Sequence, residues 1–146
     1  MTDTLVSWAG SDVGLATILA VIAATLLVGF FLWRKGRPLP AGSEGRVFRA
    51  SRLSRGNFLF PTQVLITPTS LVHYTPQWIG KLEHSIHIAH IASVKIDTNL
   101  FFSNVLVETS GGTSTVSCHG HRKSDAVAMK KLVEKYQTEY YRAGRG

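Results

Sequence analysis

The spacing of the hydrophobic positions changes twice along the chain. From Val13 to Trp33, 21 residues carry no charge, and threonines supply the only polar side chains. After Gly45, short segments of alternating apolar and polar residues are separated by Gly, Pro and Ser, a pattern typical of β-strands. From Ser124 onward, apolar residues recur at helical spacing. The pattern therefore predicts one long apolar helix, a β-rich domain and a closing amphipathic helix.

The apolar run is long enough to cross a membrane. A helix rises about 1.5 Å per residue, so this run spans roughly 31 Å, the thickness of a bilayer hydrocarbon core. Trp8 and Trp33 lie near its ends, where indole rings favour the interface. The alternative, a cleaved signal peptide, requires a basic start and a shorter apolar stretch. Here the start is acidic and R-K-G-R follows the run, so we expect a retained transmembrane helix at residues 13–33.

The charges on either side predict the orientation of this helix. Residues 1–12 contain no Lys or Arg, whereas residues 34–55 contain seven. Basic flanks remain on the cytoplasmic side of a membrane. We therefore expect an extracytoplasmic N-terminus at 1–12 and a cytoplasmic C-terminal domain. The single cysteine, Cys118, suits that reducing compartment and excludes a disulfide-stapled secreted domain.

A basic linker rich in Pro and Gly follows at residues 34–45, with the sequence R-K-G-R-P-L-P-A-G-S-E-G. Proline and glycine disfavour continuation of the helix, which should end near Arg34–Gly36. Because the tether is short, the next domain must work close to the membrane surface. We expect that domain at 46–141 and a short tail at 142–146.

About seven short strands are predicted in the domain. Pro61 should interrupt the second strand because proline cannot donate to a ladder, and Ser110-Gly111-Gly112 is a hairpin signal. The expected strands are Val47–Arg52, Phe58–Phe60 continued by Gln63–Thr67, Leu71–Tyr74, Lys81–Ile88, Ser93–Thr98, Val105–Thr109 and Thr113–Cys118.

An amphipathic helix should close the chain. Ser124 is the expected N-cap, with Asp125 in the first turn and a stop at Gly144. Roughly 100 residues bury one core and no more. The expected fold class is therefore mainly β, as a strongly bent sheet or partly open barrel with the helix capping one end. The predicted apolar stripe of this helix consists of Met129, Leu132, Val133, Tyr136 and Tyr140.

Five stretches of this region together resemble the bacterial pleckstrin-homology-like (PH-like) domains. Small bacterial inner-membrane proteins with one or two spans and such a domain are similar in layout. The resemblance implies a binding or scaffolding module and not an enzyme. Some eukaryotic relatives bind phosphoinositide head groups, a role not generally assigned to the bacterial ones. The stretches are R-A-S-R-L (Arg49–Leu53), V-L-I-T-P-T-S-L-V (Val64–Val72), I-H-I-A-H-I-A-S-V-K-I (Ile86–Ile96), N-V-L-V-E-T-S-G-G-T (Asn104–Thr113) and S-D-A-V-A-M-K-K-L-V (Ser124–Val133).

The overall charge and the absence of known motifs limit the classes of function that we expect. Lys and Arg number 16 against 9 Asp and Glu, a formal charge of +7. Much of that charge lies beside the predicted helix, where topology accounts for it, and no aromatic-basic recognition motif accompanies it, so nucleic acid is not an expected partner. The sequence also lacks a P-loop, G-x-S-x-G, H-E-x-x-H and C-x-x-C. We expect neither catalytic residues nor a cofactor.

Histidines are the conspicuous candidates for a metal site. His84, His87 and His90 are spaced by three, and His119 and His121 flank a glycine. On a strand, side chains alternate between faces, so this spacing does not bring three ligands together. We expect solvated or hydrogen-bonded histidines and no metal.

Basic residues are candidates for contact with anionic lipid. Arg34, Lys35 and Arg37 follow the apolar helix, and Arg52 and Arg55 fall near the first hairpin. A basic residue close to an anionic surface contributes about 1 kcal/mol of binding. The alternative is that these residues only set the topology.

Two apolar features are candidates for contact with partner proteins. Ala16, Ala20 and Ala24 form a small-residue stripe that lets helices approach closely in lipid, although alanine is common in any apolar span. Asn99–Asn104 reads as a hairpin tip. Its apolar residues could dip into lipid, contact a partner or fold back over the barrel end. They are Leu100, Phe101 and Phe102.

These observations predict a non-enzymatic, membrane-anchored interaction or scaffold module. It would be an accessory subunit of a larger membrane complex. No residue or motif of the sequence distinguishes among respiratory, photosynthetic, secretion and envelope assemblies. The alternative is a peripheral sensor that binds anionic lipid head groups through the basic residues of its domain.

Overall fold

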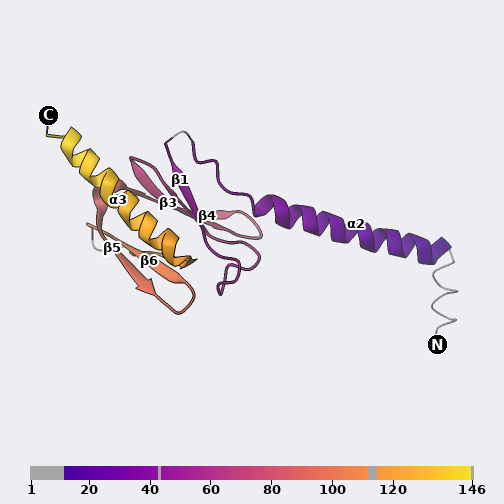
Figure 1. Ribbon diagram of the computed structural model, residues 1–146. Coiled ribbons are helices and arrows are strands. Elements are labelled where there is room, and N and C mark those ends of the chain that lie inside the picture. Colours follow the sequence, from indigo (N-terminus) through magenta and orange to yellow (C-terminus); the bar gives the residue numbers. More distant parts are fainter. Residues whose placement is uncertain (1–11, 43, 112–114, 146) are drawn as a thin grey trace. The chain divides into compact units, whose positions relative to one another are not determined.

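The computed structural model describes residues 12–42, 44–111 and 115–145, and it divides into two compact units, Met1–Lys35 and Gly36–Gly146 (Figure 1). Two predicted features lie partly outside the described residues. They are the N-terminal segment with Trp8 and the central residues of the hairpin turn from Gly112 onward.

The first unit contains the helix α2 (Asp12–Lys35). Within its stretch Val13–Lys35, the most apolar 18 residues have a mean hydropathy of 2.6, so the helix is long and apolar enough to cross a membrane. Thr17 and Thr25 donate their hydroxyls to the carbonyls four residues earlier, at 2.7 and 2.8 Å, so both polar groups are satisfied inside the helix. The helix ends at Lys35, as the Pro- and Gly-rich linker predicted. Such a helix is compatible with a membrane anchor and also with a signal sequence.

The second unit contains seven antiparallel strands in two sheets, followed by the helix α3 (Lys123–Ala143). The predicted fold class is confirmed. A short 3₁₀ turn, η1 (Ile88–His90), connects the two sheets. The first sheet has the order β1 (Arg46–Arg49), β2 (Gln63–Ile66), β3 (Ser70–Pro76) and β4 (Lys81–His87), and the second has the order β5 (Ile91–Thr98), β6 (Ser103–Thr109) and β7 (Thr115–His121).

One hydrophobic core joins the strands to α3. Four residues of the predicted stripe of α3 face it: Met129 and Val133 are buried, and Leu132 and Tyr136 pack against the core. Tyr140, the fifth, is 45% exposed and lies outside the core. The strands contribute β-branched and aliphatic side chains from their inward positions, as their alternation predicted. The buried strand residues include Val64, Ile66, Leu71, Ile86, Val105, Val107, Val116 and Cys118.

Two local predictions were wrong. Phe58–Phe60 is not a strand, because Asn57 holds the segment in a bend by accepting hydrogen bonds from the amide and hydroxyl of Thr62, at 2.9 and 3.0 Å. Ser124 is not the N-cap of α3. The helix begins one residue earlier, with Arg122 at the N-cap and no side-chain capping bond.

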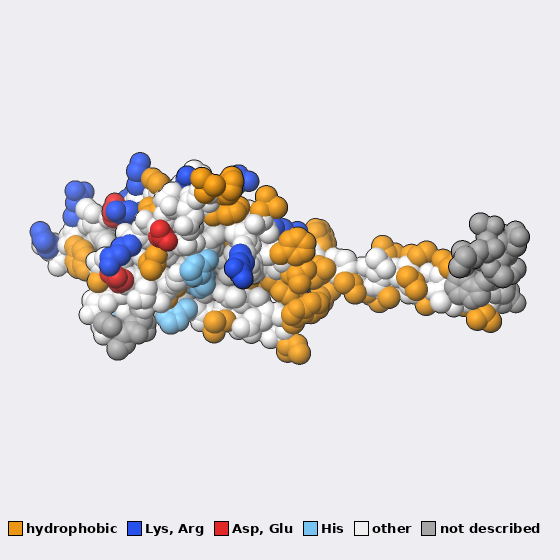
Figure 2. Space-filling view, turned by 90° about the horizontal axis from the view of Figure 1, so that it is seen from below, with side chains coloured by type: hydrophobic (Ala, Val, Ile, Leu, Met, Phe, Trp, Pro, Cys, Tyr) orange, Lys and Arg blue, Asp and Glu red, His pale blue; other side chains and the backbone are white. Residues whose placement is uncertain are grey.

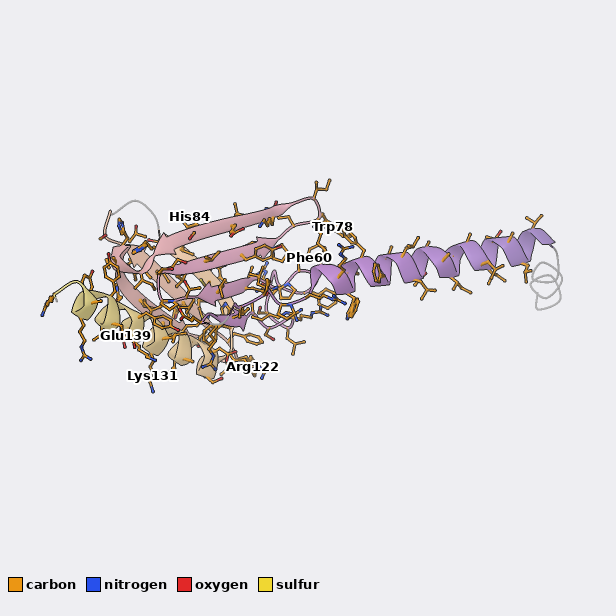
Figure 3. The ribbon with its side chains drawn as sticks, turned by 90° about the horizontal axis from the view of Figure 1, so that it is seen from above. Phe60, Trp78, His84, Arg122, Lys131 and Glu139 are labelled. Carbon is orange, nitrogen blue, oxygen red and sulfur yellow. The ribbon has the colours of Figure 1, made fainter. Side chains whose placement is uncertain are left out.

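The topology brings three connections to the same end of the domain. Because β1 and β3 both pair antiparallel with β2, they run in the same direction, and the connections that follow them emerge together. We call residues 50–62, 77–80 and 99–102 the loop end. At the opposite end, Gln137 of α3 donates to the carbonyls of Ile88 and Ile91, at 3.2 and 2.7 Å. Figure 3 shows Phe60 and Trp78 at the loop end, far from Glu139.

Candidate functional site

Exposed apolar side chains gather on the loop end. Ile79 is 94% exposed, Leu53 is 86% exposed and Leu100 is 80% exposed. Figure 2 shows hydrophobic side chains grouped over one end of the domain. A contiguous patch of large apolar residues marks a contact surface more often than chance exposure does. Its members are Leu53 and Phe58 from the first connection, Trp78 and Ile79 from the second, and Leu100 and Phe101 from the third.

Side-chain contacts hold the three connections together. The Phe60 ring meets the edge of Trp78 with 5.4 Å between ring centroids, which joins the first connection to the second (Figure 3). A hollow of about 450 Å³ lies between the first and third connections, bordered by Arg55, the residues Leu100 to Phe102, and His119 of β7. The structure thus places Arg55 beside the apolar hairpin tip, although the sequence presented them as separate candidates.

The first connection is fixed to β7. Ser51 donates its amide to the carbonyl of Gly120 at 2.8 Å. The Asn57 side chain donates to the Ser54 hydroxyl at 2.8 Å and to the carbonyl of His119 at 3.4 Å. Ser54 and Asn57 are both buried. We call these hydrogen bonds of Ser51, Ser54 and Asn57 the clasp. They hold the first connection against β7 and leave several of its apolar residues exposed to solvent.

A buried glutamine ties the linker to the loop end. Gln63, the first residue of β2, is 1% exposed. Its amide nitrogen donates to the carbonyl of Arg37 at 3.0 Å, and its amide oxygen accepts from the Leu39 N–H at 2.8 Å. Gln63 is not among the site residues predicted from the sequence. Its signal is a long polar side chain at the start of an otherwise apolar strand, Q-V-L-I.

The candidate lipid contacts fall into separate groups. Arg34 and Lys35 occupy the last turn of α2, and Arg37 begins the linker. Arg52 and Arg55 are exposed and follow β1 in the first connection, on either side of Leu53. Arg55 borders the hollow beside the hairpin tip, whereas Arg52 lines a different hollow near β1 and the start of α3.

The small-residue stripe lies on α2. Ala16, Ala20 and Ala24 are exposed on that helix within the first unit. Their spacing of four places them on one face, so close packing against another helix stays a prediction.

The histidines take different environments. Within the described ranges, no three His, Cys, Asp or Glu residues are placed to hold a metal ion. His87 accepts a hydrogen bond from the Ala89 N–H at 3.2 Å and thereby caps η1. His121 is fully buried, and neither of its ring nitrogens has a hydrogen-bond partner among the described residues. The prediction of solvated or hydrogen-bonded histidines is therefore wrong for His121, because β7 carries it into the interior.

Burial sets the protonation of two groups near this site. It lowers the pKa of His121 to about 4, although the carboxylate of Asp125 acts in the opposite direction. Burial, helped by the nearby His119 and His84, also lowers the pKa of His73. Both rings are therefore neutral at pH 7.

Burial also makes Cys118 unreactive. It is fully buried in the core, and burial raises the pKa of its thiol to about 12. Since the thiolate is the nucleophile, we expect a maleimide to label the folded full chain at least about a hundredfold more slowly than the denatured chain. Mass spectrometry with and without denaturant measures this. A Ser110→Cys variant, with its thiol on an exposed turn, should label at once in the folded state, and equally fast labelling of native Cys118 would contradict its burial.

Comparison of the chain with protein-family models finds no match, and comparison with curated proteins finds no significant match.

Proposed function

We propose that this protein is a non-enzymatic, single-pass interaction module of the bacterial inner membrane, in which α2 anchors a PH-like domain. It would serve as an accessory subunit of a larger membrane complex. The observation that carries this proposal is the apolar loop end, where Ile79 and Leu100 are almost fully exposed. Large apolar and aromatic side chains of this kind form the centres of protein interfaces.

The attachment of the linker supports a membrane-proximal role for this surface. Only Gly36 separates the last residue of α2 from Arg37, whose carbonyl accepts a hydrogen bond from Gln63 at the loop end. With α2 as the anchor, the chain thus leaves the membrane and joins the domain at the end that carries the apolar residues. The surface is suited to membrane-embedded partners, and the stripe at Ala16, Ala20 and Ala24 offers such partners a second contact.

A specific observation favours contact with anionic lipid as the second candidate. Arg52 and Arg55 flank Leu53, which is 86% exposed. Basic side chains around an exposed apolar residue suit the boundary between head groups and acyl chains. Arg34, Lys35 and Arg37 would add to this attraction beside the anchor.

Site-specific photo-crosslinking in native membranes distinguishes the two candidates. A photoreactive amino acid at Ile79 or at Leu100 should form adducts with one or a few discrete membrane proteins. The same amino acid at Glu139, which is exposed at the opposite end of the domain, is the matched control. Adducts with phospholipid alone would establish the second candidate. If no adduct forms with protein or phospholipid, or if Glu139 gives the same adducts, the proposal that the loop end is a contact surface is wrong.

The proposed orientation has its own test. A cysteine introduced at exposed Ser110 should be protected from a membrane-impermeant maleimide in intact cells and should be labelled after lysis. The native Cys118 is buried and adds no background. A cysteine at Thr2, on the other side of the anchor, should show the reverse pattern. Labelling of Ser110→Cys in intact cells would place the domain outside the cytoplasm.

A further inference from the structure

A second hollow of the domain is lined by arginines from three segments. It has a volume of about 400 Å³ and lies between β1 and the start of α3. Arg46 and Arg49 come from β1, Arg52 from the first connection, and Arg122 from the N-cap of α3 (Figure 3). The sequence does not reveal this cluster, because Arg122 lies 70 residues further along the chain than Arg52. We call this hollow the arginine cavity.

The arginines of the cavity outnumber its acidic residues, since Asp125 is the one carboxylate among the described residues that line it. Among the described residues, none of the four guanidinium groups takes part in an ion pair. Asp125 is the acidic residue that lines the cavity, and its field also acts on His121. Burial, followed by repulsion from Arg52, lowers the pKa of Arg49. Arg52 thus lies close enough to Arg49 to disfavour its charge.

Arg49 has an unmet hydrogen-bonding group. Its Nη2 atom is buried and has no partner among the described residues. A buried donor without an acceptor is costly, and most such groups in folded proteins are paired. Arg46, by contrast, lies over the Phe48 ring, with 5.1 Å from its guanidinium carbon to the ring centroid. The cavity is therefore bordered by one guanidinium held against a ring and by another with a buried nitrogen that has no partner among the described residues.

The start of α3 adds further donors. Arg122 occupies the N-cap, where a Ser, Thr, Asp or Asn side chain would normally bond the first-turn amides, and it makes no capping bond. The first turn of a helix presents free N–H groups and a partial positive charge. At this helix, of 21 residues, they lie beside the arginine cavity.

We propose that the arginine cavity binds a phosphate group. Planar guanidinium groups form paired hydrogen bonds with phosphate oxygens, and helix N-termini favour the same ligand. A phosphate bound between the exposed side chains of Arg52 and Arg122 would neutralise the clustered charge. The phosphate comes from a lipid head group or from a small soluble molecule. The cavity uses none of the apolar residues proposed to contact partner proteins, so this inference does not depend on that function; it shares Arg52 with the proposed lipid contact.

The first experiment titrates inorganic phosphate into the full chain in a neutral detergent, with potassium chloride adjusted to keep the ionic strength constant. Thermal unfolding should show a saturable stabilisation. Arg49→Gln and Arg122→Gln should each weaken the apparent affinity at least about tenfold, because each removes a charge-assisted hydrogen bond. Arg122 is exposed, so that variant reports on binding even if Arg49→Gln unfolds. Lys131→Gln removes the same charge from an exposed position of α3 outside the cavity and should leave the affinity unchanged.

The second experiment identifies the source of the phosphate. The full chain is placed in nanodiscs of phosphatidylcholine, with or without phosphatidic acid. If a lipid head group fills the cavity, phosphatidic acid should stabilise the wild type more than Arg122→Gln and should abolish the further effect of inorganic phosphate. If inorganic phosphate stabilises both kinds of nanodisc equally, the ligand is soluble. The proposal is overturned if neither phosphate nor phosphatidic acid has a saturable effect, or if Lys131→Gln weakens both as much as Arg122→Gln does.

Discussion

Replacing Gly120 with alanine is expected to lower the free energy of unfolding by about 3 kcal/mol. Gly120 has a φ of +76°, a left-handed conformation that costs other residues about 1–2 kcal/mol. A Cβ atom at this position would also lie 2.0 Å from the Ser54 hydroxyl oxygen and 2.5 Å from its Cβ. Because Ser54 is buried and hydrogen-bonded to Asn57, it has little room to move, and overpacking adds about 1–3 kcal/mol.

Urea unfolding of the full chain in mild detergent, followed by tryptophan fluorescence, measures this loss. Gly56→Ala is the matched control. Gly56 also has a positive φ, +88°, but its added Cβ would meet no atom within 4 Å, so we expect a loss of about 1 kcal/mol. Equal losses in the two variants would show that the clasp between the first connection and β7 contributes nothing. In Gly120→Ala the displaced clasp should also weaken crosslinking from Leu100, since the first connection borders the hollow beside the hairpin tip.

Acidification is expected to destabilise the domain through His121. Its pKa is about 4 in the folded protein, below the ordinary value of 6.5, because the buried ring cannot be solvated when charged. The unfolded chain therefore binds the proton more readily. The full stability is present above pH 6.5 and is lost as the pH falls from 6.5 towards 4. A shift of this size corresponds to about 3 kcal/mol.

The measurement is the urea midpoint of the full chain between pH 7.5 and pH 4. His121→Leu should remove most of the decline, since leucine has no titrating group and leaves no buried nitrogen unpaired. Part of the slope should persist, because burial also lowers the pKa of His73. The Asp125 carboxylate acts against the lowering of the His121 pKa and so reduces the contribution of His121 to the slope. His90→Leu, at an exposed position of η1, should keep the wild-type slope. An unchanged slope in His121→Leu would contradict the assignment.

Features that depend on residues close together in the sequence were predicted correctly. α2 was predicted from uninterrupted apolarity, and α3 from apolar residues at helical spacing, since both signals lie within a few turns of chain. Gly144 ends α3 as expected. The predictions that were wrong concern positions where a distant contact overrides the local pattern. Phe58–Phe60 has the aromatic and aliphatic residues typical of a strand, but Asn57 and the Phe60–Trp78 ring contact hold it in a bend.

The candidate site could be predicted only in fragments. The apolar residues at the hairpin tip and the basic residues after β1 were each visible as local clusters. Their placement around one hollow was not, because Arg55 and Phe102 are separated by four strands of the fold. The same limitation concealed the arginine cavity, which requires Arg122 to lie beside β1. The role of Gln63 could not be predicted, because its hydrogen-bond partners are backbone atoms of the linker. Backbone atoms are the same in every residue and give no signal in the sequence.

The sequence by itself determined the long apolar helix, the strand-rich domain, the closing helix and the clustering of basic residues after the helix. Those properties follow from the spacing of apolar, polar and charged residues within one segment of the chain, and that spacing can be read without knowing the contacts between segments. The tertiary structure alone decided that three connections share one end, that the linker joins the domain there, that four arginines surround one cavity and that His121 is buried. Those features depend on strand order and register, which arise from packing between segments far apart in the chain and leave no periodic pattern within any one of them.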